Sequence, residues 1–158
     1  MTAGTEGPAA DGLLAELPPE GRELLMQLAG AVVLPARTRV FEEGGEADRF
    51  WIIRSGTVAL DVHVPGRGSA VVETIGAGGL LGWSWLCPPR QWHLGAGTRE
   101  TTLAWEFDAA AVRDLCTERP ALGLALVTLV ARTIGERLRA TRTRLLDLYA
   151  PQPGGPAP

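Results

Sequence analysis

The stretch LPARTRVFEEGGEADRFWIIRSGTV, residues 34–58, carries the pattern that decides the fold. Its β-branched and aromatic residues gather in two short runs, 39–41 and 50–53. Glycines at Gly44-Gly45 lie between these runs, and Gly56 separates the second run from the next segment of the chain. Because glycine reaches backbone conformations that tight turns require, the stretch predicts short strands joined by turns.

The same alternation continues on both sides of this stretch. Glycine-containing breaks at 65–68 and 76–79 separate the later runs, and the strands we expect are 32–34, 39–41, 50–53, 57–64, 70–75 and 101–107. Short strands at such regular spacing are typical of an antiparallel roll. The sequence therefore predicts an α+β, mainly β fold: an antiparallel β-roll or jelly-roll of about eight strands, with N-terminal helices and a long C-terminal helix.

The period changes to that of a helix at both ends of the predicted roll. A first helical segment covers about 13–30 and is interrupted by Pro18-Pro19. Asp108 is the expected N-cap of a short helix at 109–116, and Pro120 begins a helix that reaches about Tyr149. The domains we expect are a disordered tail (1–11), a roll with N-terminal helices (12–119), a long dimerisation helix (120–150) and a second disordered tail (151–158).

Composition limits the function classes. Of 158 residues 46% are hydrophobic and 21% charged, which is typical of a globular domain. All 15 basic residues are arginine, so chemistry that depends on lysine is excluded, and the net charge of −3 excludes a uniformly basic nucleic-acid binder. Two isolated cysteines, no secretion signal and no apolar run of about 18–20 residues predict a cytoplasmic protein without a membrane segment.

The long helix carries an apolar stripe near heptad spacing, from Leu122 to Leu148. Thirty helical residues span about 45 Å, which exceeds the width of a small domain, so we expect a homodimer through this helix. The alternative is that the helix folds back along its own roll. The residues predicted for the dimer face are Leu126, Leu129, Ile134, Leu138 and Leu145.

Residues 34–58 resemble the opening of the cyclic-nucleotide-binding domain of the Crp/Fnr regulators, and the resemblance covers about 13–149. It implies a β-roll sensor whose long helix dimerises and lines the ligand pocket. In that family the long helix leads into a helix-turn-helix. A DNA-recognition module of this kind needs about 50 further residues after the helix. Only eight residues follow Ala150, so we expect no autonomous DNA binding.

The family's ligand cassette has a Gly-Glu pair and, about ten residues on, an arginine followed by a small residue. Here the segment 79–94 reads GLLGWSWLCPPRQWHL. Trp83 stands where the family has its glutamate; Trp92 is nearest in register to the arginine, and Arg90 is two residues early. The chain thus resembles a short form with an altered phosphate-binding cassette, for which we expect weak or no cyclic AMP binding.

The cassette still supplies the candidate ligand-binding residues. Its tryptophans either stack on a planar ligand or fill the roll, and Arg90 is the candidate anion clamp. No cofactor is expected beyond a nucleotide-like or other small planar or anionic ligand. The residues predicted to bind it are Leu81, Gly82, Trp83, Ser84, Trp85, Leu86, Arg90 and Trp92.

These observations predict a non-enzymatic regulatory sensor or binding module. One alternative is a ligand-free subunit that binds another protein. A second, less favoured alternative is a small roll-fold metal enzyme, but His63 and His93 have no His-x-His partner, so we predict neither metal ligands nor catalytic residues.

Overall fold

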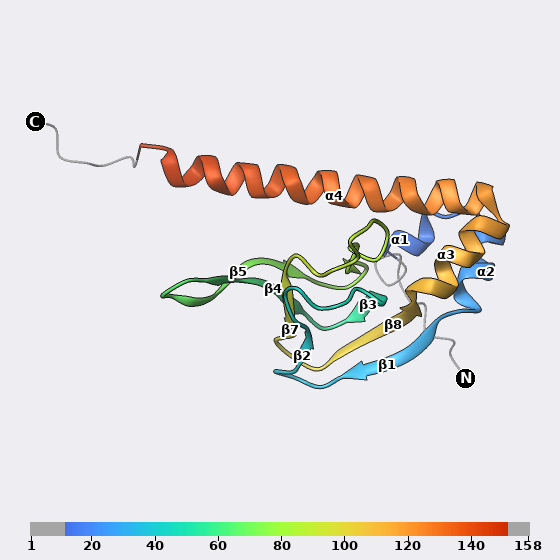
Figure 1. Ribbon diagram of the computed structural model, residues 1–158, viewed down its shortest axis with the longest axis horizontal. Coiled ribbons are helices and arrows are strands. Elements are labelled where there is room, and N and C mark those ends of the chain that lie inside the picture. The colour runs from blue at the N-terminus through green and yellow to red at the C-terminus, as the bar shows by residue number, and fades with distance from the viewer. Residues whose placement is uncertain (1–11, 152–158) are drawn as a thin grey trace, which may run out of the picture.

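The computed structural model describes residues 12–151, among which it places eight strands and four helices (Figure 1). The chain order is α1 (Gly12–Ala15), α2 (Pro19–Met26), β1 (Gly30–Leu34), β2 (Arg39–Phe41), β3 (Arg49–Ser55), β4 (Val58–Val64), β5 (Gly68–Ile75), β6 (Leu80–Leu81), β7 (Gly95–Thr98), β8 (Thr102–Asp108), α3 (Ala109–Glu118) and α4 (Pro120–Tyr149). The tails predicted at 1–11 and 151–158 lie outside the described residues, except for Pro151.

The strands form two four-stranded antiparallel sheets, in the orders β1-β8-β3-β6 and β2-β7-β4-β5. One hydrophobic cluster joins them, with Ile52 and Leu81 from the first sheet and Val58 and Ala96 from the second. The fold class predicted from the sequence, a mainly β antiparallel roll with helices at both ends, is confirmed.

Two strands are absent from the set predicted from the sequence. The β6 strand has only two residues, too few to show a period, and β7 reads Gly-Ala-Gly-Thr, without the alternation that marks a strand. Tertiary pairing defines both, since β6 pairs with β3, and β7 lies between β2 and β4.

The N-terminal helical segment is shorter than predicted and is divided. The prediction of helix over 13–30 is wrong at its end, because α2 stops at Met26 and Gly30 already begins β1. Pro19 stands in the first turn of α2, where its missing N–H costs nothing. The prediction for Asp108 is confirmed: its Oδ1 accepts a hydrogen bond of 2.9 Å from the Ala111 amide at the start of α3.

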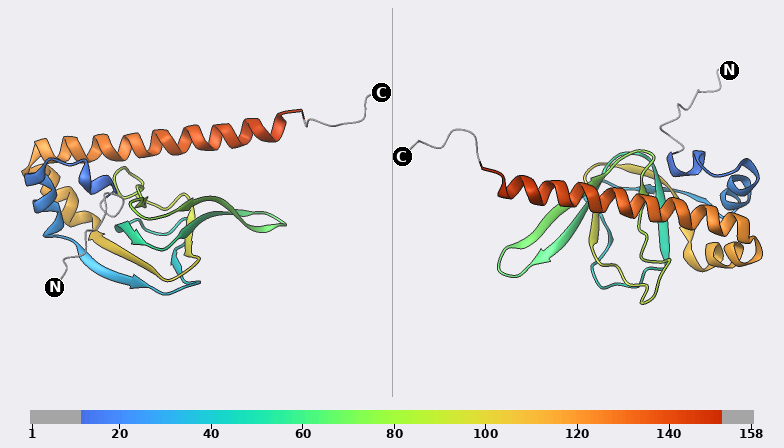
Figure 2. Two further views of the ribbon diagram at one scale, coloured as in Figure 1. Left: turned by 180° about the vertical axis from the view of Figure 1, so that it is seen from behind. Right: turned by 90° about the horizontal axis from the view of Figure 1, so that it is seen from above.

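Helix α4 runs along one side of the roll, and its C-terminal half extends over the β4–β5 hairpin (Figures 1 and 2). Its N-terminal half packs on the core, where Leu126 is 1% and Leu129 7% exposed. We therefore correct the predicted dimer face: these two leucines are buried within the core of their own chain. Ile134 is half-buried against the same core, whereas Leu138 is 69% and Leu145 53% exposed.

Gly56, in the turn between β3 and β4, allows a stability prediction. It has φ +92°, and a Cβ there would lie 2.5 Å from Thr102 Oγ1 and 2.7 Å from the Thr101 carbonyl oxygen. Gly66 has a similar φ, +78°, and open space around it. We expect Gly66→Ala to cost about 1–2 kcal/mol of unfolding free energy from backbone strain alone. Gly56→Ala should cost about 2–5 kcal/mol, since overpacking adds to the strain.

Chemical denaturation of the two variants and the unmodified protein measures both losses. Equal losses for Gly56→Ala and Gly66→Ala would contradict the close approach of the turn to β8.

Candidate functional site

Two of the three cassette tryptophans belong to the core of the roll. Trp85 is 0% exposed, stacks on Phe50 with ring centroids 4.4 Å apart, and donates from Nε1 to the Gly82 carbonyl at 3.2 Å. Trp92 stacks on Phe41 with centroids 3.9 Å apart and an interplanar angle of 14°. Both rings therefore occupy the interior of the roll.

Gly82 makes this packing possible. It has φ +90°, and a Cβ at this position would lie 2.8 Å from the Trp92 ring. Of the other predicted ligand residues, Leu81 and Ser84 are buried, and Leu86 is half-buried against the core.

Trp83 is the cassette tryptophan that faces a cavity. Its ring lies 4.5 Å from that of His93, tilted by 44°, and Ser84 Oγ lies 3.4 Å from His93 Nδ1. A cavity of about 200 Å³ separates these rings from α4. A second crevice, of about 20 Å³, shares several of these lining residues and reaches Phe41 and Trp92. The cavity is lined by Leu60, Val72, Glu73, Trp83, His93, Leu94, Ile134, Arg137, Leu138 and Thr141.

Arg90 is not at this cavity, contrary to its predicted role as anion clamp. It is exposed, has φ +55°, and contributes a main-chain bond, in which its carbonyl accepts from the Ala47 amide at 2.8 Å. The loop that carries Arg90 therefore leaves its side chain outside the set of residues that line the cavity.

The cation at the cavity is Arg137, which α4 supplies. Its side chain is only 15% exposed, its Nη2 donates to the Leu80 carbonyl, and its Nε lies 3.6 Å from Glu73 Oε1. Burial lowers the pKa of the Arg137 guanidinium, and the carboxylates of Glu73 and Glu136 oppose that shift. A charged group has thus been brought out of water between the roll and the long helix.

The sequence contains a signal for Arg137, although the predicted site does not include this residue. Arg137 follows the buried Val130 by seven residues, and Arg144 follows it by seven more, so all three lie on the face of α4 that meets the roll. Arg144 donates to the Val72 carbonyl in the same way as Arg137 does to Leu80. Two arginines of α4, Arg137 and Arg144, therefore bind main-chain carbonyls of the roll.

His93 adds an aromatic face without a charge at neutral pH. Burial, and next the charge of Arg137, lower its pKa below the usual 6.5, while Glu43 acts in the opposite direction. The neutral imidazole packs against the Trp83 indole. The charges at the cavity are therefore one buried guanidinium and the carboxylate of Glu73.

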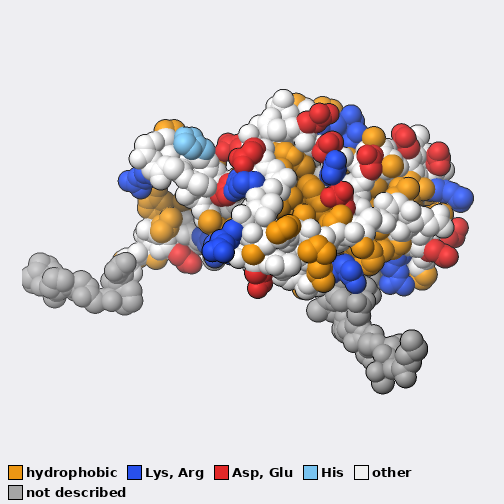
Figure 3. Space-filling model, turned by 90° about the horizontal axis from the view of Figure 1, so that it is seen from below, with side chains coloured by type: hydrophobic (Ala, Val, Ile, Leu, Met, Phe, Trp, Pro, Cys, Tyr) orange, Lys and Arg blue, Asp and Glu red, His pale blue; other side chains and the backbone are white. Residues whose placement is uncertain are grey.

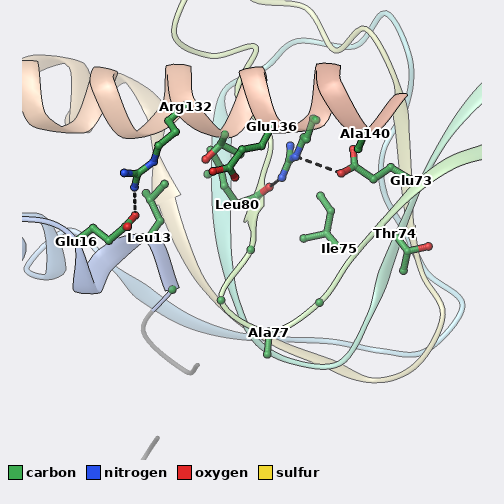
Figure 4. Close-up of a pocket in the computed structure, with 16 residues that line it drawn as sticks. Leu13, Glu16, Glu73, Thr74, Ile75, Ala77, Leu80, Arg132, Glu136 and Ala140 are labelled. Atoms are coloured by element: carbon green, nitrogen blue, oxygen red, sulfur yellow. Dashed lines mark hydrogen bonds and ion pairs between the residues drawn. The ribbon is translucent and has the colours of Figure 1, made fainter. Parts of the chain in front are cut away.

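A larger and more open hollow of about 770 Å³ lies on the other side of Arg137, between α1, the β5–β6 turn and α4 (Figure 4). Its charged groups largely pair with one another. Glu16, which directly follows α1, pairs with Arg132 on α4. The dashed lines that end on Leu80 and Glu73 in Figure 4 are the contacts of Arg137. The polar contacts that line this hollow therefore hold α4 against the rest of the domain.

The described part of the chain, residues 12–151, has no candidate metal centre. Nowhere in that range do three His, Cys, Asp or Glu side chains gather where they could hold one metal ion. No helix in the same range combines the length and apolar character needed to cross a membrane.

Comparisons with known proteins relate this architecture to regulators. The family model of the cyclic nucleotide-binding domain matches residues 31–119. A CRP-like cAMP-activated global transcriptional regulator of Mycobacterium tuberculosis is 28% identical over 140 residues, which cover 89% of this chain and 61% of the relative. The chain thus spans about three-fifths of the length of this curated relative.

Solved structures share the fold at low identity. A cyclic nucleotide-binding domain from Methylobacillus flagellatus superimposes with a TM-score of 0.79 at 16% identity, over 92% of this chain and 85% of that one. The catabolite activator protein of Thermus thermophilus gives 0.68 at 24% identity, over 87% and 62%. The family model of the cyclic nucleotide-binding domain also matches more than half of the residues of the present chain. This chain therefore belongs to the cyclic nucleotide-binding domain family.

Proposed function

We propose that the protein is a regulatory small-molecule sensor of the cyclic-nucleotide-binding-domain type, with weak or no binding of cyclic AMP. The observation that carries the proposal is the cavity of about 200 Å³ between the cassette and α4. Ligand pockets commonly measure about 300–1,000 Å³, so this cavity suits a ligand smaller than a nucleotide.

The polar groups at the cavity support the same interpretation. The indole of Trp83 donates a hydrogen bond but accepts none, so it offers nothing to a ribose hydroxyl. The Arg137 guanidinium, the cation nearest to the cassette ring, already lies 3.6 Å from Glu73. Arg90, the arginine nearest in sequence to the family's phosphate ligand, is exposed and outside the cavity lining, so the cassette itself supplies no clamp for a cyclic phosphate.

We propose further that the sensor works as a homodimer through α4. Five of the exposed apolar residues of this helix define the dimer seam, our name for Leu124, Val127, Leu138, Leu145 and Leu148, which are between 40% and 81% exposed; Leu146 and Tyr149 are also exposed but lie outside the seam. The five seam residues follow positions a and d of a heptad, the spacing that lets two helices pack along one another. The seam replaces the predicted dimer face that included Leu126 and Leu129.

A ligand-free interaction subunit is the second candidate function. It is favoured by Trp85 and Trp92, which fill part of the roll. Hydrophobic side chains also gather on the face seen from below (Figure 3). Val33 of β1 and its partner Leu103 of β8 are both exposed. In either case we propose a cytoplasmic, non-enzymatic protein. We also propose that this chain alone binds no DNA sequence specifically, because its net charge is −3.

Native mass spectrometry of the protein as purified tests the sensor against the interaction subunit. We expect the mass of a dimer and, in part of the population, the added mass of a retained small molecule. A dimer that never carries or takes up a small molecule would favour the interaction subunit. A stoichiometric metal would support the enzyme alternative.

A further inference from the structure

We propose that the cavity between the cassette and α4 binds a small aromatic monocarboxylate with a single ring, and that Arg137 holds its carboxylate. The inference rests on the proposed sensor function and names the class of ligand for that site.

The size of the cavity sets the first limit. An engineered cavity of about 150 Å³ lined by aliphatic and aromatic side chains holds one benzene molecule. The cavity here measures about 200 Å³, and apolar side chains such as Leu60, Val72, Leu94 and Ile134 make up much of its wall. One ring and one carboxylate fit that volume, whereas a purine with its ribose and phosphate exceeds it.

The cassette wall supplies flat surfaces for a ring. Trp83 and the neutral His93 stand side by side, with centroids 4.5 Å apart, and both line the cavity. Aromatic pairs gain about 0.5–1.5 kcal/mol beyond the area that they bury, in offset or edge-to-face geometry. A planar ring is therefore favoured over an aliphatic chain of equal volume.

The opposite wall supplies the cation. A guanidinium carries five N–H donors, and the contacts of Arg137 within the described residues are one hydrogen bond to Leu80 O and an ion pair with Glu73 at 3.6 Å. That separation is longer than a charge-assisted hydrogen bond of about 2.7–2.9 Å. A ligand carboxylate can use the remaining donors in the two-bond geometry that arginine favours.

The site also joins two parts of the fold. Arg137, Leu138 and Thr141 belong to α4, while Trp83 and His93 belong to the cassette loop. A ligand that contacts both walls would stabilise the docked position of the helix. Because Leu138 also belongs to the dimer seam, a ligand in the cavity would alter the packing of the two helices in the dimer.

The test is titration calorimetry and tryptophan fluorescence on the unmodified protein with phenylacetate, and with phenylacetamide as the neutral molecule of the same shape. We expect phenylacetate to bind with a dissociation constant between about 10 µM and 1 mM, a range suited to a ligand of ten heavy atoms. Phenylacetamide should bind at least tenfold more weakly, and acetate should show no binding at the same concentrations.

Two variants locate the contact. Arg137→Leu should weaken phenylacetate binding at least tenfold and leave phenylacetamide unchanged. Arg139→Leu removes an exposed arginine two residues along the same helix and should leave both unchanged. The comparison of the acid with the amide does not require a variant, so it decides the question even if Arg137→Leu fails to fold.

Equal affinity for phenylacetate and phenylacetamide would overturn the proposal, as would unchanged phenylacetate binding in a folded Arg137→Leu variant. The failure of the sensor function is a separate result. If another small molecule perturbs Trp83 while phenylacetate does not bind, the sensor stands and the aromatic acid is wrong. If native mass spectrometry and fluorescence find no ligand at all, both proposals fall.

Discussion

Cyclic AMP and cyclic GMP should bind the unmodified protein no more tightly than about 1 mM in titration calorimetry. The ribose hydroxyl would meet the Trp83 indole, which accepts no hydrogen bond, and Arg90, the arginine of the cassette, lies exposed outside the cavity lining. Each lost contact costs about 1–3 kcal/mol. The two losses together weaken a micromolar site by about two to four powers of ten.

Two substitutions of Trp83 distinguish two reasons for weak cyclic AMP binding: the lack of a hydrogen-bond acceptor for the ribose hydroxyl, and the volume that the indole occupies. Trp83→Glu restores an acceptor and vacates the indole volume, so cyclic AMP affinity should rise about tenfold or more. Trp83→Leu vacates a similar volume without an acceptor and should recover less. Micromolar cyclic AMP binding by the unmodified protein would defeat this prediction and restore an ordinary nucleotide sensor.

An element of the fold could be predicted from the sequence only where its own residues carried a local pattern. The strands around Trp51 and Val62 span seven residues each, and they formed where the period predicted them. In contrast, β6 and β7 exist because neighbouring strands offer them hydrogen bonds. No propensity in a two-residue strand or in Gly-Ala-Gly-Thr reports such pairing.

The candidate site could be predicted only where the family's spacing could be transferred. Trp83 lies at the cavity as the alignment of the cassette implies. The cassette spacing predicts Arg90 as the clamp because it is close in sequence to the position of the family's arginine, but the loop leaves it exposed. Arg137 is 54 residues away from Trp83 in sequence, and only the docking of α4 brings the two to one cavity.

The stripe on α4 shows why a one-dimensional pattern can combine two surfaces. Leu126 and Leu138 belong to the same run of apolar residues, yet twelve residues at about 100° each place them about 120° apart around the helix. Leu126 is buried in the core of its own chain, whereas Leu138 is 69% exposed. A heptad count does not distinguish an intramolecular face from an intermolecular one, whereas the burial of each leucine does.

Leu138→Arg should convert the dimer into monomers. Burying a leucine contributes about 1.5–3 kcal/mol, and a two-fold seam loses two of them. Two like charges would also face each other there. We therefore expect the dimer dissociation constant to rise at least about 100-fold, as measured by light scattering and sedimentation over a range of protein concentrations. Since Leu138 is 69% exposed in the single chain, the monomeric variant should remain folded.

Thr143→Arg is the matched control, because it adds the same side chain to an exposed position of α4 that lies off the dimer seam. From Leu138 to Thr143 the helix turns by about 140°, which places Thr143 away from the seam. This variant should dimerise as the unmodified protein does. If Thr143→Arg dissociates the dimer and Leu138→Arg does not, the protein dimerises through another face of α4. If the unmodified protein is already a monomer at about tens of micromolar, the exposed leucines of α4 must serve a different partner, and the interaction subunit becomes the better account of the chain.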